Sequence, residues 1–195
     1  LAVGITDAVP KLISFRLLEA TLGAPFAVRL ECSEGDFDHL LGELALNRLD
    51  VVIADRSAPQ RANLKLQSHL LGNVGMAWYG SPELFRIYSP DFPHLLEGVP
   101  LLLPARSDPL RRSVDAWIEA NDLSPVIIGE FSDSALLKTF GRAGLGLFPA
   151  PDGMQEDIHA QFGAMRIGLM NGVSESWYAI STPRKVQHPA VQLIH

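Results

Sequence analysis

Residues 37–55 read FDHLLGELALNRLDVVIAD, and the spacing of apolar residues changes halfway along this stretch. In its first half, apolar side chains follow the i, i+3, i+4, i+7 spacing that places them on one face of a helix. They are Phe37, Leu40, Leu41 and Leu44. The run that follows, residues 49–55, is almost continuously apolar, which is typical of a strand covered on both faces. We therefore predict an amphipathic helix that packs on the sheet to which this strand belongs.

The first part of the chain contains further apolar runs, separated by helical segments. The predicted strands are residues 1–5 (LAVGI), 25–32 (PFAVRLEC) and 49–55 (LDVVIAD). Strand, helix, strand, helix and strand at this spacing form consecutive βαβ units, which have parallel strands and right-handed crossovers. We predict a parallel sheet.

From about residue 74 the same pattern begins again. Strands are predicted at 74–80, 99–105, 126–131 and 145–150, and helices are predicted to begin near Pro109 and Asp133. A strand at 176–182 and a short helix at 188–195 follow. No linker rich in Pro, Gly and Ser separates the two halves, so we predict two α/β units that share crossover segments.

The composition is that of a globular protein. The 195 residues carry a formal net charge of −6 and the basic residues are scattered, so this chain by itself is expected to bind nucleic acid poorly. The single cysteine, Cys32, excludes an internal disulfide framework and favours a reducing compartment, the cytoplasm. No apolar run reaches the ~20 residues that span a bilayer. The sequence opens without Met on what reads as a core strand, so we expect a further domain upstream.

The first predicted helix, residues 8–22, has two apolar faces. Val9, Leu12, Ile13, Leu17 and Ala20 lie on one side of a helical wheel, and Phe15, Leu18 and Leu22 lie on the other. One face can cover the sheet, whereas the second needs another surface, because a surface helix normally has a single apolar face. That surface is either a partner subunit or the interior of the same chain, where Val191 and Ile194 are the nearest candidates.

Short polar residues stand at the carboxyl ends of the predicted strands. They are Thr6, Asp7, Ser33, Glu34, Asp55, Arg56, Ser57, Arg106, Ser107, Asp108, Ser132 and Asp133, and Phe148 stands in the last of these segments. Parallel sheets bind ligands outside the carboxyl ends of their strands, so these residues are expected to line a cleft between the two units. The alternative is helix capping, in which Asp7, Ser33, Asp108 and Ser132 accept hydrogen bonds from the helix that follows each of them.

The charge at these strand ends is mixed. Helix N-termini and Arg106 favour an anionic ligand. Four carboxylates oppose one: Asp7, Glu34, Asp36 and Asp133. A cationic or zwitterionic ligand is therefore at least as compatible with these residues as a small carboxylate.

No residue pattern supports catalysis. The six histidines lack the spacing of metal ligands. Cys32, near a predicted strand end, is a conceivable nucleophile, but a lone cysteine usually serves as a small apolar side chain. Gly141, Gly144 and Gly146 precede a strand, whereas the glycines of a dinucleotide fingerprint follow one, so they are expected to end a helix and turn into the strand. We expect no enzymatic activity, no metal ligand and no cofactor.

Four segments, in this order, resemble the effector-binding domain of LysR-type transcriptional regulators. They are LAVGITDAVPKLI (1–13), FAVRLECSEGDFDHLLGELALNRLDVVIADR (26–56), LLLPARSDPLRRSVDAWIEANDLSP (101–125) and GEFSDSALLKTFGRAGLGLFPAP (129–151). In that family a leucine-rich helix precedes an LD-hydrophobic-I strand, and a later segment runs from glutamate through leucines and glycines into a hydrophobic-Pro strand. The resemblance covers essentially the whole chain.

The resemblance implies an α/β fold of the type 2 periplasmic-binding-protein class, with two Rossmann-like lobes and a ligand cleft between them. It places lobe I at residues 1–73 plus 174–195 and lobe II at 74–173. It also implies an N-terminal winged helix-turn-helix domain, absent from this sequence, that makes the DNA contacts. The family's ligand positions match Thr6, Asp7, Ser33, Glu34, Arg106, Ser107, Ser132, Asp133 and Phe148.

The implied function is that of a sensor. A small-molecule or ion effector shifts a conformational equilibrium that the DNA-binding domains report. The resemblance also implies a homodimer, with higher oligomers in the full-length protein, and an antiparallel pairing that places Phe15, Leu18 and Leu22 in the interface. No membrane contact is expected. The alternatives on the same fold are the solute-binding protein of a transporter and an enzyme that uses Cys32 or a cleft carboxylate.

Overall fold

The computed structural model describes residues 1–60 and 65–194. The chain divides into two compact units, which are described separately below. Unit 1 comprises Leu1–Asn73 and Ser176–His195, and unit 2 comprises Val74–Glu175. Both units combine helices with strands, in agreement with the predicted α/β fold class.

Unit 1 is built on a parallel sheet. Its elements are β1 (Ala2–Thr6), α1 (Lys11–Leu22), β2 (Glu31–Gly35), α2 (Phe37–Ala45), β3 (Val51–Ala54) and α7 (Pro189–Gln192). β1 lies between β2 and β3 and runs parallel to both, and β8 (Met165–Ser181) pairs antiparallel with β3. The predicted parallel arrangement of the first three strands is confirmed.

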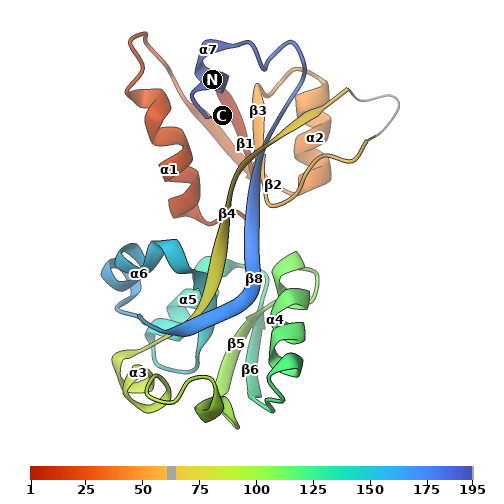
Figure 1. Ribbon diagram of the computed structural model, residues 1–195. Helices are drawn as coiled ribbons and strands as arrows, with labels where there is room; N and C mark the ends of the chain where they lie inside the picture. Colours follow the sequence, from red (N-terminus) through yellow and green to blue (C-terminus); the bar gives the residue numbers. More distant parts are fainter. Residues whose placement is uncertain (61–64, 195) are drawn as a thin grey trace. The chain divides into compact units, whose positions relative to one another are not determined.

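Helix α2 forms where the spacing of the leucines predicts it. The Asp36 carboxylate accepts a hydrogen bond from the His39 backbone N–H at 2.9 Å and caps the helix. Apolar side chains of α2 and of the strands form one cluster: Leu40, Leu41, Leu44, Leu49, Val52, Ala54 and Ile180. Figure 1 shows α2 on one face of the unit 1 sheet and α1 on the other. The predicted amphipathic helix is confirmed.

Helix α1 buries a different face from the one that its hydrophobicity predicts. Ala20 is exposed, and the buried side chains are Ser14, Leu18 and Thr21. The Ser14 hydroxyl donates to the Pro10 carbonyl at 3.3 Å, and the Thr21 hydroxyl donates to the Leu18 carbonyl at 2.6 Å. Because these hydroxyls are satisfied within the helix, they can be buried. Of the face that was predicted to cover the sheet, Val9 just before the helix is buried, whereas the members within α1 are half-buried or exposed.

Several strand boundaries also differ from the prediction. The strand expected at 25–32 begins at Glu31 and runs to Gly35. β2 is an edge strand with mostly exposed residues, so apolar content is a poor guide to its position. β4 (Gln67–Gly80) and β8 are longer than the apolar runs at 74–80 and 176–182. The additional parts of both strands include exposed polar residues, which do not produce an apolar run.

Unit 2 contains most of the remaining elements. They are α3 (Pro82–Tyr88), η1 (His94–Leu96), β5 (Pro100–Pro104), α4 (Pro109–Ala120), β6 (Val126–Phe131), α5 (Ser134–Arg142), β7 (Phe148–Pro151), η2 (Asp152–Met154) and α6 (Gln155–Phe162). β5 pairs parallel with β6, and β7 pairs antiparallel with β4. The helices expected near Pro109 and Asp133 are confirmed, whereas α3 and α6 were not predicted.

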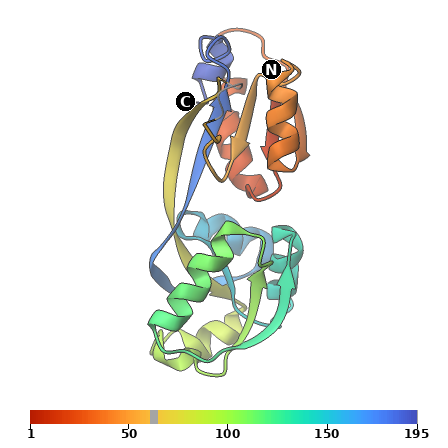
Figure 2. The ribbon, with the colours of Figure 1, turned by 90° about the vertical axis from the view of Figure 1, so that its right-hand side faces the viewer.

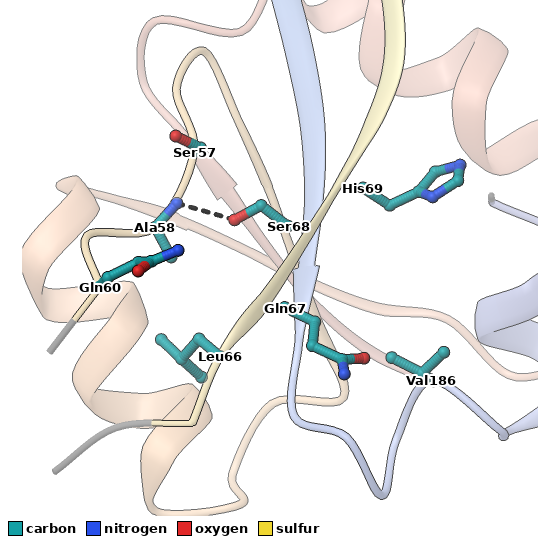
Figure 3. Close-up of a pocket in the computed structure, with 8 residues that line it drawn as sticks. All are labelled: Ser57, Ala58, Gln60, Leu66, Gln67, Ser68, His69 and Val186. Carbon is teal, nitrogen blue, oxygen red and sulfur yellow. Dashed lines mark hydrogen bonds between the residues drawn. The ribbon is translucent and has the colours of Figure 1, made fainter. Parts of the chain in front are cut away.

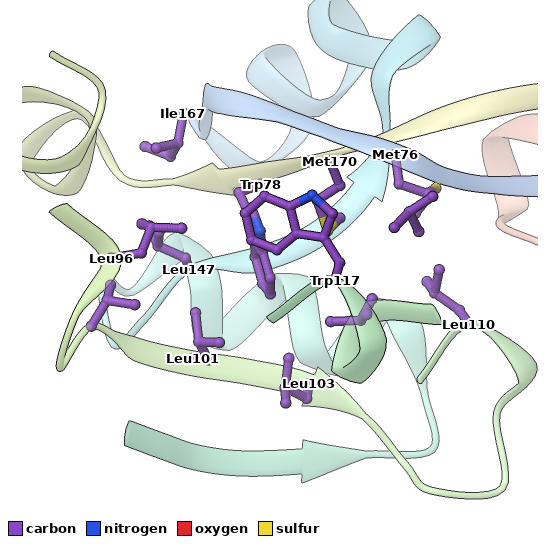
Figure 4. Packing of buried hydrophobic residues seen from close by; sticks show 13 residues of the cluster. Met76, Trp78, Leu96, Leu101, Leu103, Leu110, Trp117, Leu147, Ile167 and Met170 are labelled. Atoms are coloured by element: carbon purple, nitrogen blue, oxygen red, sulfur yellow. The ribbon is translucent and has the colours of Figure 1, made fainter. Parts of the chain in front are cut away.

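The core of unit 2 is centred on two tryptophans (Figure 4). Trp78 is fully buried, and its ring centroid lies 6.1 Å from that of Trp117 on α4. Phe92 stacks on Trp117 with centroids 5.8 Å apart. Leu101 and Leu103 of β5 belong to the same cluster. Burial of each large apolar side chain contributes about 1.5–3 kcal/mol, so the core anchors β5 and the segment that follows it.

Gly144 and Gly146 lie between α5 and β7, as predicted, whereas Gly141 lies within the last turn of α5. α5 ends at Arg142, and Gly144 adopts a left-handed conformation with φ of 77° in the turn before β7. A Cβ atom at Gly141 would lie 2.2 Å from a ring carbon of Phe148, so only glycine fits there. These residues end the helix and turn the chain into the strand.

β4 and β8 belong to both units. The unit boundary falls after Asn73 in β4 and before Ser176 in β8. Figures 1 and 2 show the two strands side by side, and the Asn73 side-chain amide donates to Ser176 Oγ at 2.8 Å. The C-terminal part of β8 lies between β3 and β4 in the sheet. Unit 1 is therefore completed by residues that follow unit 2 in the sequence.

Candidate functional site

The carboxyl edge of the unit 1 sheet carries Thr6 and Asp55 on neighbouring strands. β1 and β3 end at a similar level, because Ile5 is opposite Ile53 in their parallel register. Thr6 is 3% exposed, and its Oγ1 has no hydrogen-bond partner in the described part of the chain. Asp55 Oδ2 is also buried without a partner among residues 1–60 and 65–194, whereas Oδ1 accepts from Arg56 Nε at 3.2 Å. Two buried polar atoms at this edge are therefore unsatisfied.

Helix α1 begins close to this edge in sequence and has no side-chain cap. Its N-cap residue is Pro10, which offers no side-chain acceptor, and Asp7 is exposed. The Val9 N–H donates to the Thr6 carbonyl at 2.9 Å, which closes the turn between β1 and α1. The capping alternative is therefore wrong for Asp7. The N-terminus of α1 keeps the partial positive charge of an uncapped helix end.

Ser33 and Glu34 lie within β2 and not after it. Both are exposed residues of the strand that pairs with β1. Ser33 caps no helix, because Asp36 occupies the N-cap position of α2. Glu34 forms an ion pair with Lys11 at the start of α1. This ion pair offsets part of the negative charge that the sequence predicts for the unit 1 edge.

The carboxyl edge of β5 and β6 in unit 2 contains an ion-pair network. Arg106 and Ser107 follow β5 and are exposed, and Arg106 Nε lies 3.6 Å from Glu130 Oε1 on β6. Arg111 Nη2 donates to the same Glu130 oxygen at 2.9 Å. This hydrogen bond outweighs desolvation and lowers the pKa of Glu130 below its ordinary value. Glu130 therefore offsets the positive charge of Arg106.

Helix capping explains two aspartates of the unit 2 edge. Asp108 Oδ1 accepts from the Leu110 N–H at 2.9 Å, and Asp133 Oδ1 accepts from the Leu136 N–H at 2.6 Å. These carboxylates begin α4 and α5. Ser132 is exposed and is not the cap of α5. The capping prediction is thus confirmed for Asp108 and wrong for Ser132.

Phe148 is not a surface residue. It is fully buried in β7, and its ring stacks on that of Tyr79 with centroids 6.1 Å apart. Burial raises the pKa of Tyr79 to about 12, so this hydroxyl stays protonated and donates to the Pro151 carbonyl at 3.1 Å. The Phe148 ring packs in the interior because Gly141 leaves room for it. The Phe148 side chain is therefore not exposed in this structure, and its contact with a ligand stays a prediction.

The predicted interface stripe on α1 is only partly exposed. Phe15 and Leu22 are 53% and 61% exposed, as a surface for a partner requires. Leu18 is only 6% exposed and is buried within its own chain. The buried face of α1 includes the small residues Ser14 and Thr21, which brings the intervening Leu18 inward with them. Leu18 therefore packs within its own chain, and the interface stays a prediction that the exposed Phe15 and Leu22 can support.

The structure contains a pocket of about 530 Å³ within unit 1 (Figure 3). Its lining residues are Ser57, Ala58, Gln60, Leu66, Gln67, Ser68, His69 and Val186. The Ala58 N–H donates to Ser68 Oγ at 2.8 Å across it. Among the strand-end residues that the sequence singles out, only Ser57 lines this pocket. The pocket is thus separate from the predicted ligand positions.

The described residues give little support for a metal site or for a reactive thiol. Residues 1–60 and 65–194 contain no cluster of three or more His, Cys, Asp or Glu side chains that could hold a metal ion. Cys32 is exposed on β2, and partial desolvation raises its pKa, which disfavours the reactive thiolate. Within the described chain, no helix has both the length and the apolar character that a membrane crossing requires.

The structure distributes the predicted ligand positions over two edges. Thr6 and Asp7 lie at the unit 1 edge with Ser33 and Glu34 on the adjacent strand, whereas Arg106, Ser107, Ser132 and Asp133 lie at the unit 2 edge.

Sequence reasoning named Asp55 only as a strand-end residue, and it missed Glu130 and Arg111. A signal for Glu130 was its charge within the apolar run VIIGEF, and a signal for Arg111 was its position on the apolar face of a helix. A charged residue at such a position indicates a charged partner.

Two α/β units, each with parallel strands that end in short polar residues, define a ligand-binding domain. A sequence model of the LysR substrate binding domain matches residues 1–195. The chain therefore belongs to this family and is the effector-binding domain of a LysR-type protein.

One curated relative is the transcriptional activator protein NhaR of Escherichia coli (strain K12), which is 33% identical over 193 residues. The alignment covers 98% of this chain and 63% of NhaR, so the chain spans less than two thirds of that relative. The segments GITDAVPK (4–11), GEFSDSALLKTFG (129–141) and VQHPAVQLI (186–194) resemble NhaR in particular. The identity confirms this resemblance.

Solved structures share the fold. HinK, a LysR family transcriptional regulator from Pseudomonas aeruginosa, matches with a TM-score of 0.75 and 15% identity, over 100% of this chain and 66% of that one. The reduced regulatory domain of OxyR2 from Vibrio vulnificus matches with a TM-score of 0.71 and 16% identity, over 100% of this chain and 93% of that one. These matches confirm the predicted fold of LysR regulatory domains.

Proposed function

We propose that this chain is the sensing module of a DNA-binding transcriptional regulator and that its effector binds at the carboxyl edge of unit 1. The observation that carries this proposal is the pair of unsatisfied buried atoms there, Thr6 Oγ1 and Asp55 Oδ2. Each buried polar atom without a partner costs about 1–3 kcal/mol. A ligand that bonds to both atoms recovers that cost on binding.

The chemistry of these atoms favours a cationic group. Asp55 Oδ2 can only accept hydrogen bonds or coordinate a cation, and the Thr6 hydroxyl can do either or donate. The uncapped N-terminus of α1 favours negative charge at the same time. We infer an alkali-metal cation or a small ammonium compound, with a zwitterion as the form that uses both features. The similarity to NhaR, a regulator of sodium/proton antiport, supports the cation.

The remaining parts of the proposal concern assembly. Phe15 and Leu22 on α1 are exposed apolar side chains, and we propose that they lie in a homodimer interface. DNA contacts are assigned to a winged helix-turn-helix domain outside this sequence, because the chain carries a net charge of −6. A DNA-binding regulator of this kind acts in the cytoplasm and is not an enzyme.

A thermal-shift series tests the proposed ligand site. The purified chain is melted in sodium, lithium and choline chlorides at equal ionic strength, across pH, and with a panel of ammonium compounds and zwitterions. A ligand at 100 times its Kd stabilises the folded chain by about 2.7 kcal/mol. Thr6→Val and Asp55→Asn should reduce the shift of the midpoint.

A matched control is Thr182→Val, because Thr182 also has a buried hydroxyl without a partner among the described residues. Thr182 directly follows β8. Because β8 runs antiparallel to β3, Thr182 lies near the amino end of β3, whereas Asp55 lies at its carboxyl end. This variant should keep the full ligand response. The proposal fails if no compound in the series raises the midpoint, or if the response survives both Thr6→Val and Asp55→Asn.

A further inference from the structure

We propose that Glu130 is a specificity-determining residue of the unit 2 edge: it occupies Arg106 and thereby excludes anionic ligand groups from this edge. This inference rests on the proposed function, because it specifies which effectors the sensing module admits. Arg106 is the one charged residue for which the sequence analysis predicted attraction of an anion. Its pairing with Glu130 at 3.6 Å reverses that expectation.

Glu130 is held in place from the interior of unit 2. Arg111 is 2% exposed, and each of its three guanidinium nitrogens donates a hydrogen bond. Nη2 donates to Glu130 at 2.9 Å, Nε donates to Asp115 at 2.8 Å, and Nη1 donates to the Pro104 carbonyl at 2.9 Å. A guanidinium that is fixed in this way does not swing out to release its carboxylate.

The same arginine connects Glu130 to the segment that presents Arg106. Pro104 is the last residue of β5, and Arg106 follows it by two positions. Arg111 therefore fixes both the end of β5 and the carboxylate that faces the Arg106 guanidinium. In the ion pair between Arg106 and Glu130, the carboxylate is therefore held by the buried Arg111, whereas the Arg106 side chain is exposed.

The charges of the network around Arg106 cancel one another. Arg106 and Arg111 carry two positive charges, and Glu130 and Asp115 carry two negative ones. The cap Asp133 adds a further carboxylate after β6, and Lys138 on α5 interacts with it electrostatically. An anionic group that binds Arg106 must compete with Glu130 for the guanidinium and approach several carboxylates. A neutral or cationic group meets no such competition.

Sulfate is a suitable probe, because it binds to an accessible arginine without other requirements. In Glu130→Gln, the amide oxygen still accepts from Arg111, but the negative charge is removed. We expect the sulfate affinity of the chain, measured by NMR titration of the Arg106 Nε–H signal at constant ionic strength, to rise about five- to tenfold. That factor corresponds to the loss of one opposing charge a few ångströms away at an exposed site.

Two further variants assign the effect. Glu119→Gln removes one negative charge from the exposed face of α4, so it controls for net charge and should leave sulfate affinity unchanged. Glu130→Gln combined with Arg106→Gln should lose the gain, as followed by the backbone amide signals of residues 105–108. Arg106→Gln as a single substitution, with Glu130 retained, should change sulfate affinity little, because Glu130 already pairs with the Arg106 guanidinium. This last variant removes only an exposed side chain, so it remains informative if Glu130→Gln does not fold.

The inference is overturned if Glu130→Gln shows no gain, if the gain persists without Arg106, or if Arg106→Gln alone abolishes sulfate binding by the wild type. These outcomes are distinct from failure of the proposed function. A cation response that depends on Thr6 and Asp55, together with unchanged sulfate affinity, would remove the role of Glu130 only. A sulfate gain in a chain that responds to no effector would remove the proposed function only.

Discussion

At the carboxyl edge of unit 1, Thr6 and Asp55 each keep a buried polar atom without a partner in the described chain. At the carboxyl edge of unit 2, Asp108 and Asp133 cap the two helices, and Glu130 is shared by two arginines. The two edges use the same residue types after the same kind of strand. The difference teaches that the same residue types can either complete a strand edge or leave it with unsatisfied polar atoms, and the proposed ligand site is the edge of the second kind. Unit 2 completes its own edge, and unit 1 does not.

The largest expected effect comes from breaking the network that completes the unit 2 edge. Arg111→Met removes the buried partner of Glu130 and Asp115, which are themselves partly exposed, and the loss of hydrogen bonds to a charged group is expected to cost about 1.5–3 kcal/mol. Urea denaturation should show this loss in the free energy of unfolding. Arg112→Met, at the exposed neighbouring position, should change stability by less than about 0.5 kcal/mol. A loss below about 1 kcal/mol for Arg111→Met would mean that the network does not stabilise unit 2.

A smaller effect should separate the capped helices from the uncapped one. Asp133→Ala removes the cap of α5 and is expected to destabilise the chain by about 0.5–2 kcal/mol. Asp7→Ala precedes α1, which has no side-chain cap, and should cost less than about 0.5 kcal/mol. Chemical denaturation of the two variants measures both values. Equal losses would show that Asp7 contributes to the start of α1 in solution, against the structure.

The smallest expected effect is a pH dependence that belongs to the unit 2 edge. The hydrogen bond from Arg111 lowers the pKa of Glu130, so folding is favoured by its ionised form. The contribution is complete above the pKa of the unfolded chain, about 4.3, and is lost as the pH falls through the lower folded pKa. Glu130→Gln should therefore flatten the loss of stability below about pH 4.5. Urea midpoints at neutral and acidic pH measure this change, and an unaltered acid slope would contradict it.

Much of the fold could be predicted because it depends on apolar spacing along the chain. The leucines of α2 and the continuous apolar run of β3 specify a helix on a sheet without reference to any distant residue. The buried face of α1 could not be found in this way. Ser14 and Thr21 bond to carbonyls of their own helix and are buried for that reason, which a hydrophobicity pattern does not contain.

For the candidate site, the sequence could predict only which residues stand at the ends of the strands. The position of Thr6 follows from the end of β1, but its lack of a partner depends on what surrounds it in three dimensions. The same applies to Phe148, because the burial of its ring beside Gly141 does not follow from its place at a strand. The shared carboxylate of Glu130 links α4, β6 and the end of β5, and no local pattern joins these segments.

The position of β8 has a consequence for the order in which the units can fold. The strand that lies between β3 and β4 in the sheet reaches unit 1 only after residues 74–175 have been made. During synthesis, the continuous chain of unit 2 can therefore acquire its core while unit 1 still lacks an inner strand. β3 then exposes an unpaired edge, which is a site for association with other chains. A nascent chain that stops before Ser176 would leave the ribosome with a foldable second unit and an unfinished first one.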